Sequence, residues 1–274
     1  MIEKTFKTLS GTIHYWLNEC DSKLDLIFLP GLTADYRLFD KQIDYFKDKY
    51  SVFVWNAPGH ATSYPFELNF NLFDTAKWLN EILSIENLNN PVVIGQSMGG
   101  YLGQVYAELF PEKIKGFVAI DTPSLQRKYY TSIELGMLKI VEPIFRVYPW
   151  KALLKNGSER VSTTEYGRKL MLDMLLIYDS EKNRYAHLVG HGYKILAEAI
   201  EKKLPYNIRC PHIFICGEED QAGSCIRYLK EYEKETGEHV YWIKGAGHNS
   251  NTDRPEIVND LIDSFVEKLD RFAL

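Results

Sequence analysis

The sequence predicts an α/β fold in which a mostly parallel central sheet is flanked by helices on both faces. Two observations favour this class: short continuous apolar runs alternate with amphipathic segments, and the alternation is interrupted by a single long helical stretch. The chain has 274 residues, which is near the upper size for a single hydrophobic core. We therefore expect one domain with an insertion rather than two domains.

The amino-terminal part supplies the first predicted strands. Residues 4–17 predict a hairpin that turns at Ser10-Gly11. Continuous apolar runs at 24–29 and 51–55 predict two buried strands, and a Pro-Gly pair follows each of them. Between residues 72 and 88 the apolar side chains recur at helical spacing, which predicts a helix with one buried face.

The alternation stops after a predicted strand at 116–120. Residues 122–209 show no strand pattern and are expected to form several helices. Pro255 suits the first position of the last helix, and Asp253 is expected to cap that helix. Strands and helices alternate again in the carboxyl-terminal part, with strands at 212–216 and 240–243 and helices at 225–235 and 255–272.

These boundaries predict a core formed by residues 1–121 and 210–274 and a helical cap, or lid, formed by residues 122–209. The predicted cap contains 15 Lys and Arg against 9 Asp and Glu, an excess of six positive charges. The whole chain carries −5, so the remainder carries −11. The excess is explained either by a solvated basic helical face or by cations that steer an anionic substrate.

A serine flanked by glycines provides the strongest chemical signal in the chain. The pattern Gly95-x-Ser97-x-Gly99 lies between an apolar run at 91–94 and a predicted helix at 101–110. In such a strand-to-helix turn the glycines leave room where side chains would collide, and the strained turn exposes the hydroxyl. The start of the following helix favours negative charge at the same point. Ser97 is therefore the candidate nucleophile.

A serine hydroxyl needs a base to accept its proton, and the base needs an acid to orient it. His248 follows the last predicted strand in a glycine-containing loop, at the sheet edge where Ser97 also emerges, and is the predicted base. Six histidines remain. We expect His60 to be structural or to form a wall of the pocket, His187 and His191 to be cap residues near the pocket, and His14, His212 and His239 to be structural.

The orienting acid is expected in the loop after the strand that precedes His248. The run Glu218-Glu219-Asp220 lies there, and Asp220 is the predicted acid because it sits past the turn and can reach back to the imidazole. The alternative interpretation is a solvated acidic loop. Asp121, which follows the preceding core strand, is the rival acid, and it is equally suited to cap the first helix of the cap.

Stabilising an oxyanion requires two N–H donors near the nucleophile. The backbone N–H of Met98, directly after Ser97, is the first predicted donor. The second is expected from the loop after the strand at 24–29, at Leu32. Gly31 is expected to permit the backbone turn that aims this N–H inward.

In its order of Ser97, Asp220 and His248, the chain resembles the α/β-hydrolase superfamily, and the likeness covers essentially the whole core. Residues 56–63 also resemble that family's Asp-x-Pro-Gly-x-Gly-x-Ser loop. Asn56 replaces the acid of that loop and Ala61 replaces a glycine. The resemblance implies a serine hydrolase without a metal or organic cofactor, with a lid where the insertion lies. A serine at this turn argues against epoxide hydrolases and dehalogenases, which use aspartate there.

The leading hypothesis is a carboxylesterase-like enzyme that cleaves a small or medium carboxylic ester, thioester or lactone through an acyl-enzyme on Ser97. One alternative is a carbon–carbon bond hydrolase or lyase whose substrate carries a carboxylate. Another is a non-catalytic small-molecule binder on the same fold, against which the complete set of three groups counts. The carboxylate of the first alternative would be held by an arginine of the cap, with Arg127, Arg146, Arg160, Arg168 and Arg184 as candidates.

The composition favours a small-molecule substrate over nucleic acid or a membrane as the binding partner. A net charge of −5 argues against nucleic acid, and no apolar run approaches the ~20 residues of a membrane span. The first residues lack the apolar region of a signal peptide, so a cytoplasmic location is expected. The four cysteines show no metal-ligand spacing and are expected to be reduced thiols. The sequence makes no prediction of oligomeric state.

Overall fold

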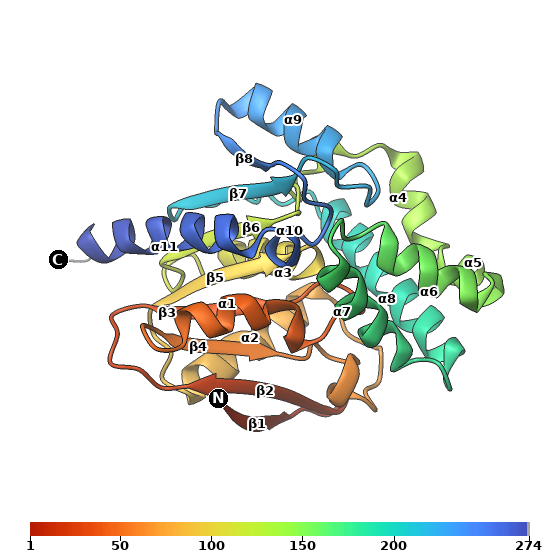
Figure 1. Ribbon diagram of the computed structural model, residues 1–274, viewed down its shortest axis with the longest axis horizontal. Coiled ribbons are helices and arrows are strands. Elements are labelled where there is room, and N and C mark those ends of the chain that lie inside the picture. Colours follow the sequence, from red (N-terminus) through yellow and green to blue (C-terminus); the bar gives the residue numbers. More distant parts are fainter. Residues whose placement is uncertain (273–274) are drawn as a thin grey trace.

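One eight-stranded sheet forms the centre of the protein, seen in a computed structural model that describes residues 1–272 (Figure 1). The first three strands in the sheet pair antiparallel and the remaining neighbours pair in parallel, which confirms the predicted fold class. From one edge to the other the strands are β1 (Ile2–Lys7), β2 (Thr12–Asn18), β4 (Ser51–Trp55), β3 (Asp25–Leu29), β5 (Pro91–Gln96), β6 (Gly116–Ile120), β7 (His212–Gly217) and β8 (Val240–Ile243).

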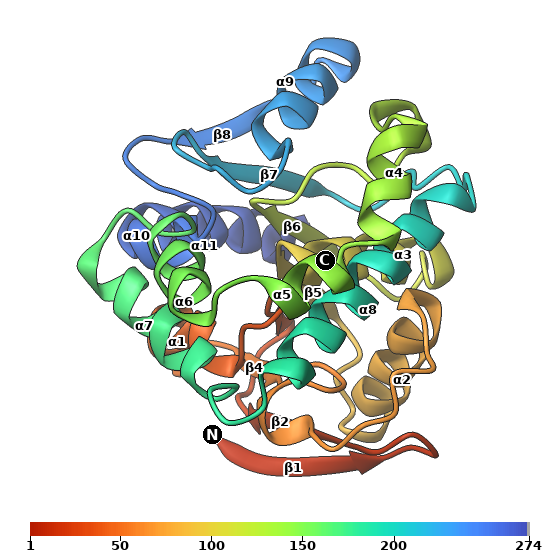
Figure 2. The same cartoon turned by 90° about the vertical axis from the view of Figure 1, so that its right-hand side faces the viewer.

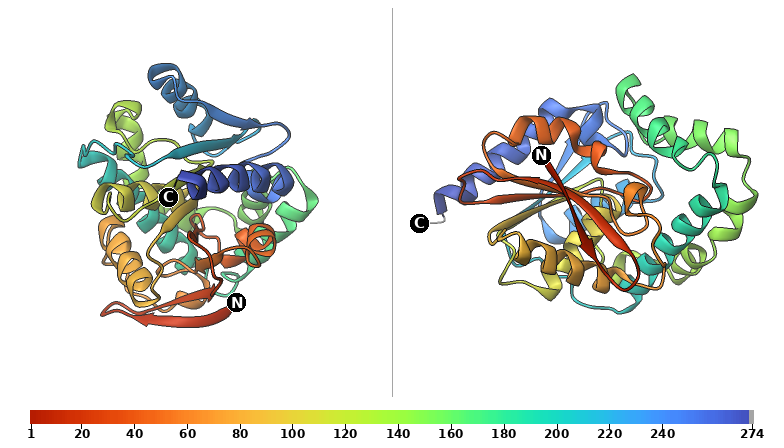
Figure 3. Two further views of the ribbon diagram at one scale, coloured as in Figure 1. Left: turned by 90° about the vertical axis from the view of Figure 1, so that its left-hand side faces the viewer. Right: turned by 90° about the horizontal axis from the view of Figure 1, so that it is seen from below.

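Helices cover both faces of this sheet (Figures 1 and 3). One face is covered by α1 (Asp40–Phe46) and α11 (Pro255–Phe272), and the other by α2 (Leu72–Ile85), α3 (Met98–Leu109) and α9 (Cys225–Thr236). Every residue of β3, β4, β5 and β6 is buried, which explains why these strands appear in the sequence as continuous apolar runs. The sequence pattern did not predict α1, because seven residues are too few to show a clear period.

Five α-helices separate β6 from β7 and lie beyond the carboxyl ends of the parallel strands (Figure 2). Residues 122–209, all of which the structure describes, contain no strand, as predicted. None of the helices within residues 1–272 combines the length and the apolar character needed to cross a membrane. The helices of this insertion are α4 (Ser132–Lys139), α5 (Glu142–Val147), α6 (Trp150–Glu159), α7 (Glu165–Leu176) and α8 (Lys182–Glu201).

Asp253, in the short helix α10 (Ser250–Asp253), ties the insertion to the core. Its carboxylate accepts hydrogen bonds from the backbone N–H of Thr163 and from that of Gly247, both at 2.9 Å. The predicted role of Asp253 as the cap of α11 is therefore wrong, although α11 does begin at Pro255. A buried carboxylate is stabilised by several N–H donors, and residues of the insertion and of the loop before His248 supply them here, whereas the residue directly before α11 is Arg254.

Candidate active site

Ser97 occupies a strained turn between β5 and α3, with φ 50° and ψ −118°. A Cβ atom at Gly95 would collide with the backbone of Gly99, and one at Gly99 would collide with the backbone of Leu29. Only glycine fits at both positions. The N–H of Ser97 donates to the carbonyl oxygen of Ile120 at 2.9 Å, which fixes the turn at the carboxyl end of the sheet.

The structure brings Ser97, His248 and Asp220 together in one hydrogen-bonded chain. The Oγ atom of Ser97 lies 2.8 Å from Nε2 of His248, and Nδ1 of the same ring lies 2.9 Å from Oδ2 of Asp220. The other oxygen of Asp220 accepts the backbone N–H of Ala222 at 2.7 Å. The side chain of His248 is 13% exposed and that of Asp220 is fully buried. This arrangement can take a proton from the hydroxyl and stabilise the imidazolium that forms.

Asp220 and His248 each stabilise the charged form of the other. Burial by itself would lower the pKa of His248, but the charge of Asp220 and its hydrogen bond more than offset burial, so the pKa is raised above 6.5. Burial likewise opposes ionisation of Asp220, and the imidazole of His248 holds the pKa of that carboxyl below its usual range. Asp220 is therefore a carboxylate beside a ring that readily accepts a proton.

Asp121, the rival acid, makes its hydrogen bonds to other residues. Its Oδ1 atom accepts the backbone N–H of Gly217 at 2.8 Å, and its Oδ2 atom accepts both the N–H and the hydroxyl of Ser250, at 2.9 and 2.8 Å. Burial and the neighbouring charge of Asp220 raise the pKa of Asp121. These bonds join the end of β7 to the loop after His248, so Asp121 neither caps a helix of the insertion nor bonds the imidazole.

The two expected oxyanion donors, Leu32 and Met98, both line a cavity beside Ser97. Within residues 1–272 neither backbone N–H donates a hydrogen bond to another protein atom, so both are free to meet an oxygen. A turn does begin at Gly31, since the N–H of Ala34 donates to the carbonyl oxygen of Gly31 at 3.3 Å, and the positive φ of 67° within this turn falls on Thr33. Gly31 is also required for space, since a Cβ there would lie 2.3 Å from Oε1 of Gln96 and 3.1 Å from the Cβ of Ser97.

The order of these residues along a mostly parallel sheet has a counterpart in known proteins. A family model described as the alpha/beta hydrolase fold matches residues 26–150 of the chain. The chain has the α/β-hydrolase fold. The matched range contains Ser97 and the loop of Leu32 but ends before the other two members of the hydrogen-bonded chain.

Three similar proteins extend the match over nearly the whole chain. A Mycoplasma genitalium protein with the provisional name esterase/lipase 2 is 24% identical over 256 residues, which cover 89% of each chain. The 3-oxoadipate enol-lactonase 2 of Acinetobacter baylyi is 23% identical over 260 residues, covering 89% of this chain and 88% of that one. The solved structure of a thermophilic esterase from Thermogutta terrifontis superposes with a TM-score of 0.77, at 18% identity and 98% coverage of each chain. The last likeness concerns the fold.

Two cavities meet at Ser97 and His248. Their walls are mostly apolar and aromatic, and many of the residues come from the helical insertion. The cavity of about 160 Å³ is lined by Phe145, Val161, Met171, Leu175, Tyr185 and Val189, among others. The cavity of about 320 Å³ is lined by Tyr101, Tyr130, Met137, Leu138, Leu196 and Tyr228, among others.

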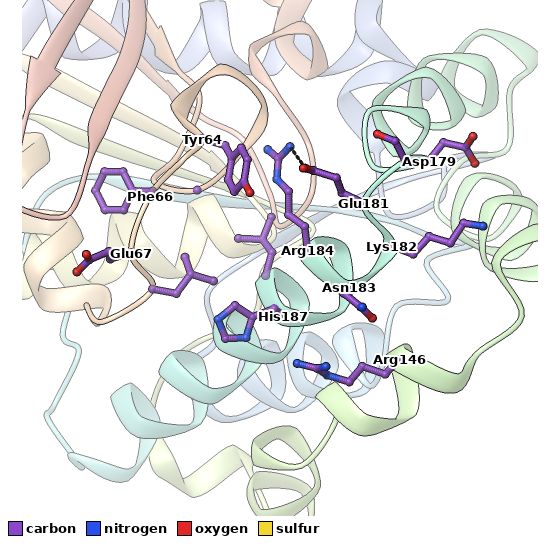
Figure 4. A pocket seen from close by; sticks show the side chains of 14 residues that line it. Tyr64, Phe66, Glu67, Arg146, Asp179, Glu181, Lys182, Asn183, Arg184 and His187 are labelled. Atoms are coloured by element: carbon purple, nitrogen blue, oxygen red, sulfur yellow. Dashed lines mark hydrogen bonds and ion pairs between the residues drawn. The ribbon is translucent and has the colours of Figure 1, made fainter.

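None of the five candidate arginines, all within the described residues, lines either cavity. Arg146 and Arg184 line a separate, wider groove of about 970 Å³ between the loop at 59–68 and the start of α8 (Figure 4). There Arg184 lies 3.3 Å from the carboxylate of Glu181. The arginine that the carbon–carbon or lyase alternative would need for a substrate carboxylate is therefore absent from the cavities at Ser97.

The other histidines also lie away from Ser97. His60 and His191 line a small apolar cavity behind Leu32 and Met98, and His187 lines the groove of Figure 4. The remaining three each contact a glutamate: His14 with Glu3, His212 with Glu238 and His239 with Glu233.

Gln96 is a positioning residue that was not predicted from the sequence. Its side-chain amide donates to the carbonyl oxygen of His248 at 2.7 Å and to the side-chain oxygen of Asn249 at 3.1 Å. The residue is buried at the end of β5, next to Ser97. A polar side chain at the end of an otherwise apolar strand was the available signal, and its partner lies 152 residues away in the sequence.

Proposed function

We propose that this α/β-hydrolase is a serine esterase that cleaves small or medium uncharged carboxylic esters, including thioesters and lactones, through an acyl-enzyme on Ser97. The observation that carries the proposal is the hydrogen-bonded chain from Ser97 through His248 to Asp220 at the meeting point of two apolar cavities. The esterase and lactonase names of similar proteins agree with it.

In the first half of the reaction, Oγ of Ser97 attacks the ester carbonyl carbon while Nε2 of His248 takes the hydroxyl proton. The carbonyl oxygen becomes an oxyanion that accepts the N–H groups of Leu32 and Met98. Asp220 stabilises the imidazolium and keeps the ring in one orientation. The carbon–oxygen bond to the alcohol then breaks, and His248 gives its proton to the leaving alcohol.

In the second half, a water molecule replaces the alcohol beside His248. The imidazole takes one proton from this water as its oxygen attacks the acyl carbon, and the same two N–H groups hold the oxyanion. The bond to Ser97 then breaks, its oxygen regains the proton from the imidazolium, and the carboxylic acid leaves.

The insertion fits the role of a cap in this proposal. Residues 122–209 contribute half of the residues that line the smaller cavity and thus influence which substituents enter. A carbon–carbon hydrolase or lyase with a carboxylate-bearing substrate is less well supported, because the cavities at Ser97 contain no arginine. A pure binder has no need of a buried acid behind the imidazole.

The decisive test combines a fluorophosphonate probe with p-nitrophenyl butyrate. We expect intact-protein and peptide mass spectrometry to find the probe on Ser97, and we expect Ser97→Ala to lose both labelling and at least ~10⁴ of kcat. Unlabelled wild-type protein would contradict the proposal and favour the binder.

Ser224 provides a matched control. It lines the larger cavity beside Ser97 but its hydroxyl makes no hydrogen bond to a residue within 1–272. Ser224→Ala should keep labelling and lose at most about twofold in kcat. Labelling of Ser97 without turnover of several ester lengths would favour the alternative carbon–carbon or lyase chemistry.

A further inference from the structure

Two thiols surround the carboxylate that supports His248. Cys216 lies near the end of β7, Asp220 lies in the following loop, and Cys225 is the first residue of α9. All three side chains are buried, and the two sulfur atoms and one carboxylate oxygen lie within 4.8 Å of one another. The spacing along the chain resembles no metal motif, and the cluster arises because the strand, loop and helix fold back on one point.

Two sulfur atoms and one carboxylate oxygen are donors that suit a thiophilic divalent ion. A tetrahedral ion bound to sulfur at about 2.3 Å places the two sulfurs about 3.8 Å apart, so only a small inward movement is needed. We propose that Cys216, Asp220 and Cys225 form a binding site for a thiophilic divalent ion such as Zn²⁺ or Cd²⁺. Each thiol releases its proton to solvent on binding, and a water molecule takes the fourth position.

An ion can reach the site from the larger cavity. Cys225 lines that cavity together with Ala222, Gly223 and Ser224 of the intervening loop. Gly223 is exposed, has φ +55°, and has no heavy atom within 4 Å of the point where a Cβ would lie. The loop is therefore open to solvent at Gly223. The sulfur of Cys216 now lies 3.5 Å from the carbonyl oxygen of Gly217, a weak contact that the ion would replace.

The proposed ion acts on the reaction through Asp220, a step that rests on the proposed function. A dication bound to this carboxylate offsets the negative charge that favours the imidazolium of His248. The imidazole then becomes a poorer proton acceptor for Ser97. Binding of the ion is therefore expected to inhibit ester hydrolysis by about tenfold or more, and removal of the ion is expected to restore it.

The binding test is a Cd²⁺ titration of the reduced full-length protein, followed by the ultraviolet charge-transfer absorption of cadmium–thiolate bonds. We expect one ion per chain in the wild type and in the Cys20→Ala/Cys210→Ala variant, which keeps the cluster. Cys216→Ala/Cys225→Ala should lose this absorption. If the double variant fails to fold by circular dichroism, Cys225→Ala alone removes one sulfur at the cavity wall. An unchanged titration in a folded variant, or no binding by the wild type, would overturn the site.

The inhibition test follows hydrolysis of p-nitrophenyl butyrate during the same titration. Activity of the wild type should fall in step with the absorption and return on adding EDTA, whereas Cys225→Ala should be insensitive at the same Cd²⁺ concentrations. Binding without inhibition would overturn the effect on Asp220 but leave the site. Absence of hydrolysis before any metal is added would instead contradict the proposed function, and the absorption would still decide the site.

Discussion

The wide groove of Figure 4 and the two cavities at Ser97 differ in size and in chemistry. The groove has a volume of about 970 Å³, and many of its lining side chains are charged or polar, among them Arg146, Arg184 and Lys182. The cavities, of about 320 and 160 Å³, have mostly apolar walls and share one hydrogen-bonded chain of reactive groups. Convergence of proton-transfer groups between mostly apolar walls therefore marks a reactive site more reliably than the size of a hollow.

The largest effect on activity is expected from removing the acid, Asp220. Asp220→Asn should lower kcat/KM for p-nitrophenyl butyrate by about 10³–10⁴, because it removes the charge that stabilises the imidazolium. Asp121→Asn should lower kcat/KM by tenfold at most and lower the melting temperature, because its bonds hold the His248 loop. Initial-rate assays measure kcat/KM of both variants, and thermal melts measure their melting temperatures. A greater kinetic loss in Asp121→Asn would reverse the assignment of the acid.

A second effect concerns pH. His248 must be neutral to accept the proton, and its pKa is raised, so kcat/KM should fall about tenfold per unit as pH drops below a midpoint that lies above 6.5. Asp220→Asn removes the cause of the raised pKa, and the midpoint of its residual activity should move to lower pH. A pH–rate profile of both proteins checks the direction, and a midpoint that moves upward would contradict it.

A third, smaller effect distinguishes the two cavities from each other. Val189→Phe reduces the space of the smaller cavity, and Leu138→Phe reduces that of the larger one. Each variant should lower kcat/KM by about tenfold for esters that are long on one side of the scissile bond, and the two should affect opposite sides. Measuring kcat/KM for a series of esters whose acyl and alcohol lengths are varied separately tests this prediction. Identical losses in both variants would mean that the cavities do not divide the substrate.

The smallest effect should come from the groove. Arg146 is half-exposed there and pairs with Glu142 on the same helix at 2.7 Å. Arg146→Ala should change kcat/KM for uncharged esters by less than about twofold, since exposed ion pairs contribute little and the side chain lies away from Ser97. A large loss, especially one confined to carboxylate-bearing substrates, would move the substrate site to the groove and favour the carbon–carbon or lyase alternative.

The sequence was most informative where one local rule decided the structure. The buried strands β3, β4, β5 and β6 appear as continuous apolar runs because both faces of a parallel sheet are covered. It was least informative where a side chain finds a distant partner. Asp253 bonds the insertion instead of capping α11, and Gln96 bonds the carbonyl oxygen of His248.

The sequence alone predicts the alternation of strands and helices, the glycine-flanked turn of Ser97 and the position of His248 after the last strand, because each depends on the properties of neighbouring residues. The folded chain was needed to show that Asp220 rather than Asp121 contacts the imidazole, that the candidate arginines do not line the cavities, and that Cys216 and Cys225 lie close to Asp220. These outcomes depend on distances between segments that are remote in the chain, and packing of the sheet, loops and insertion sets those distances.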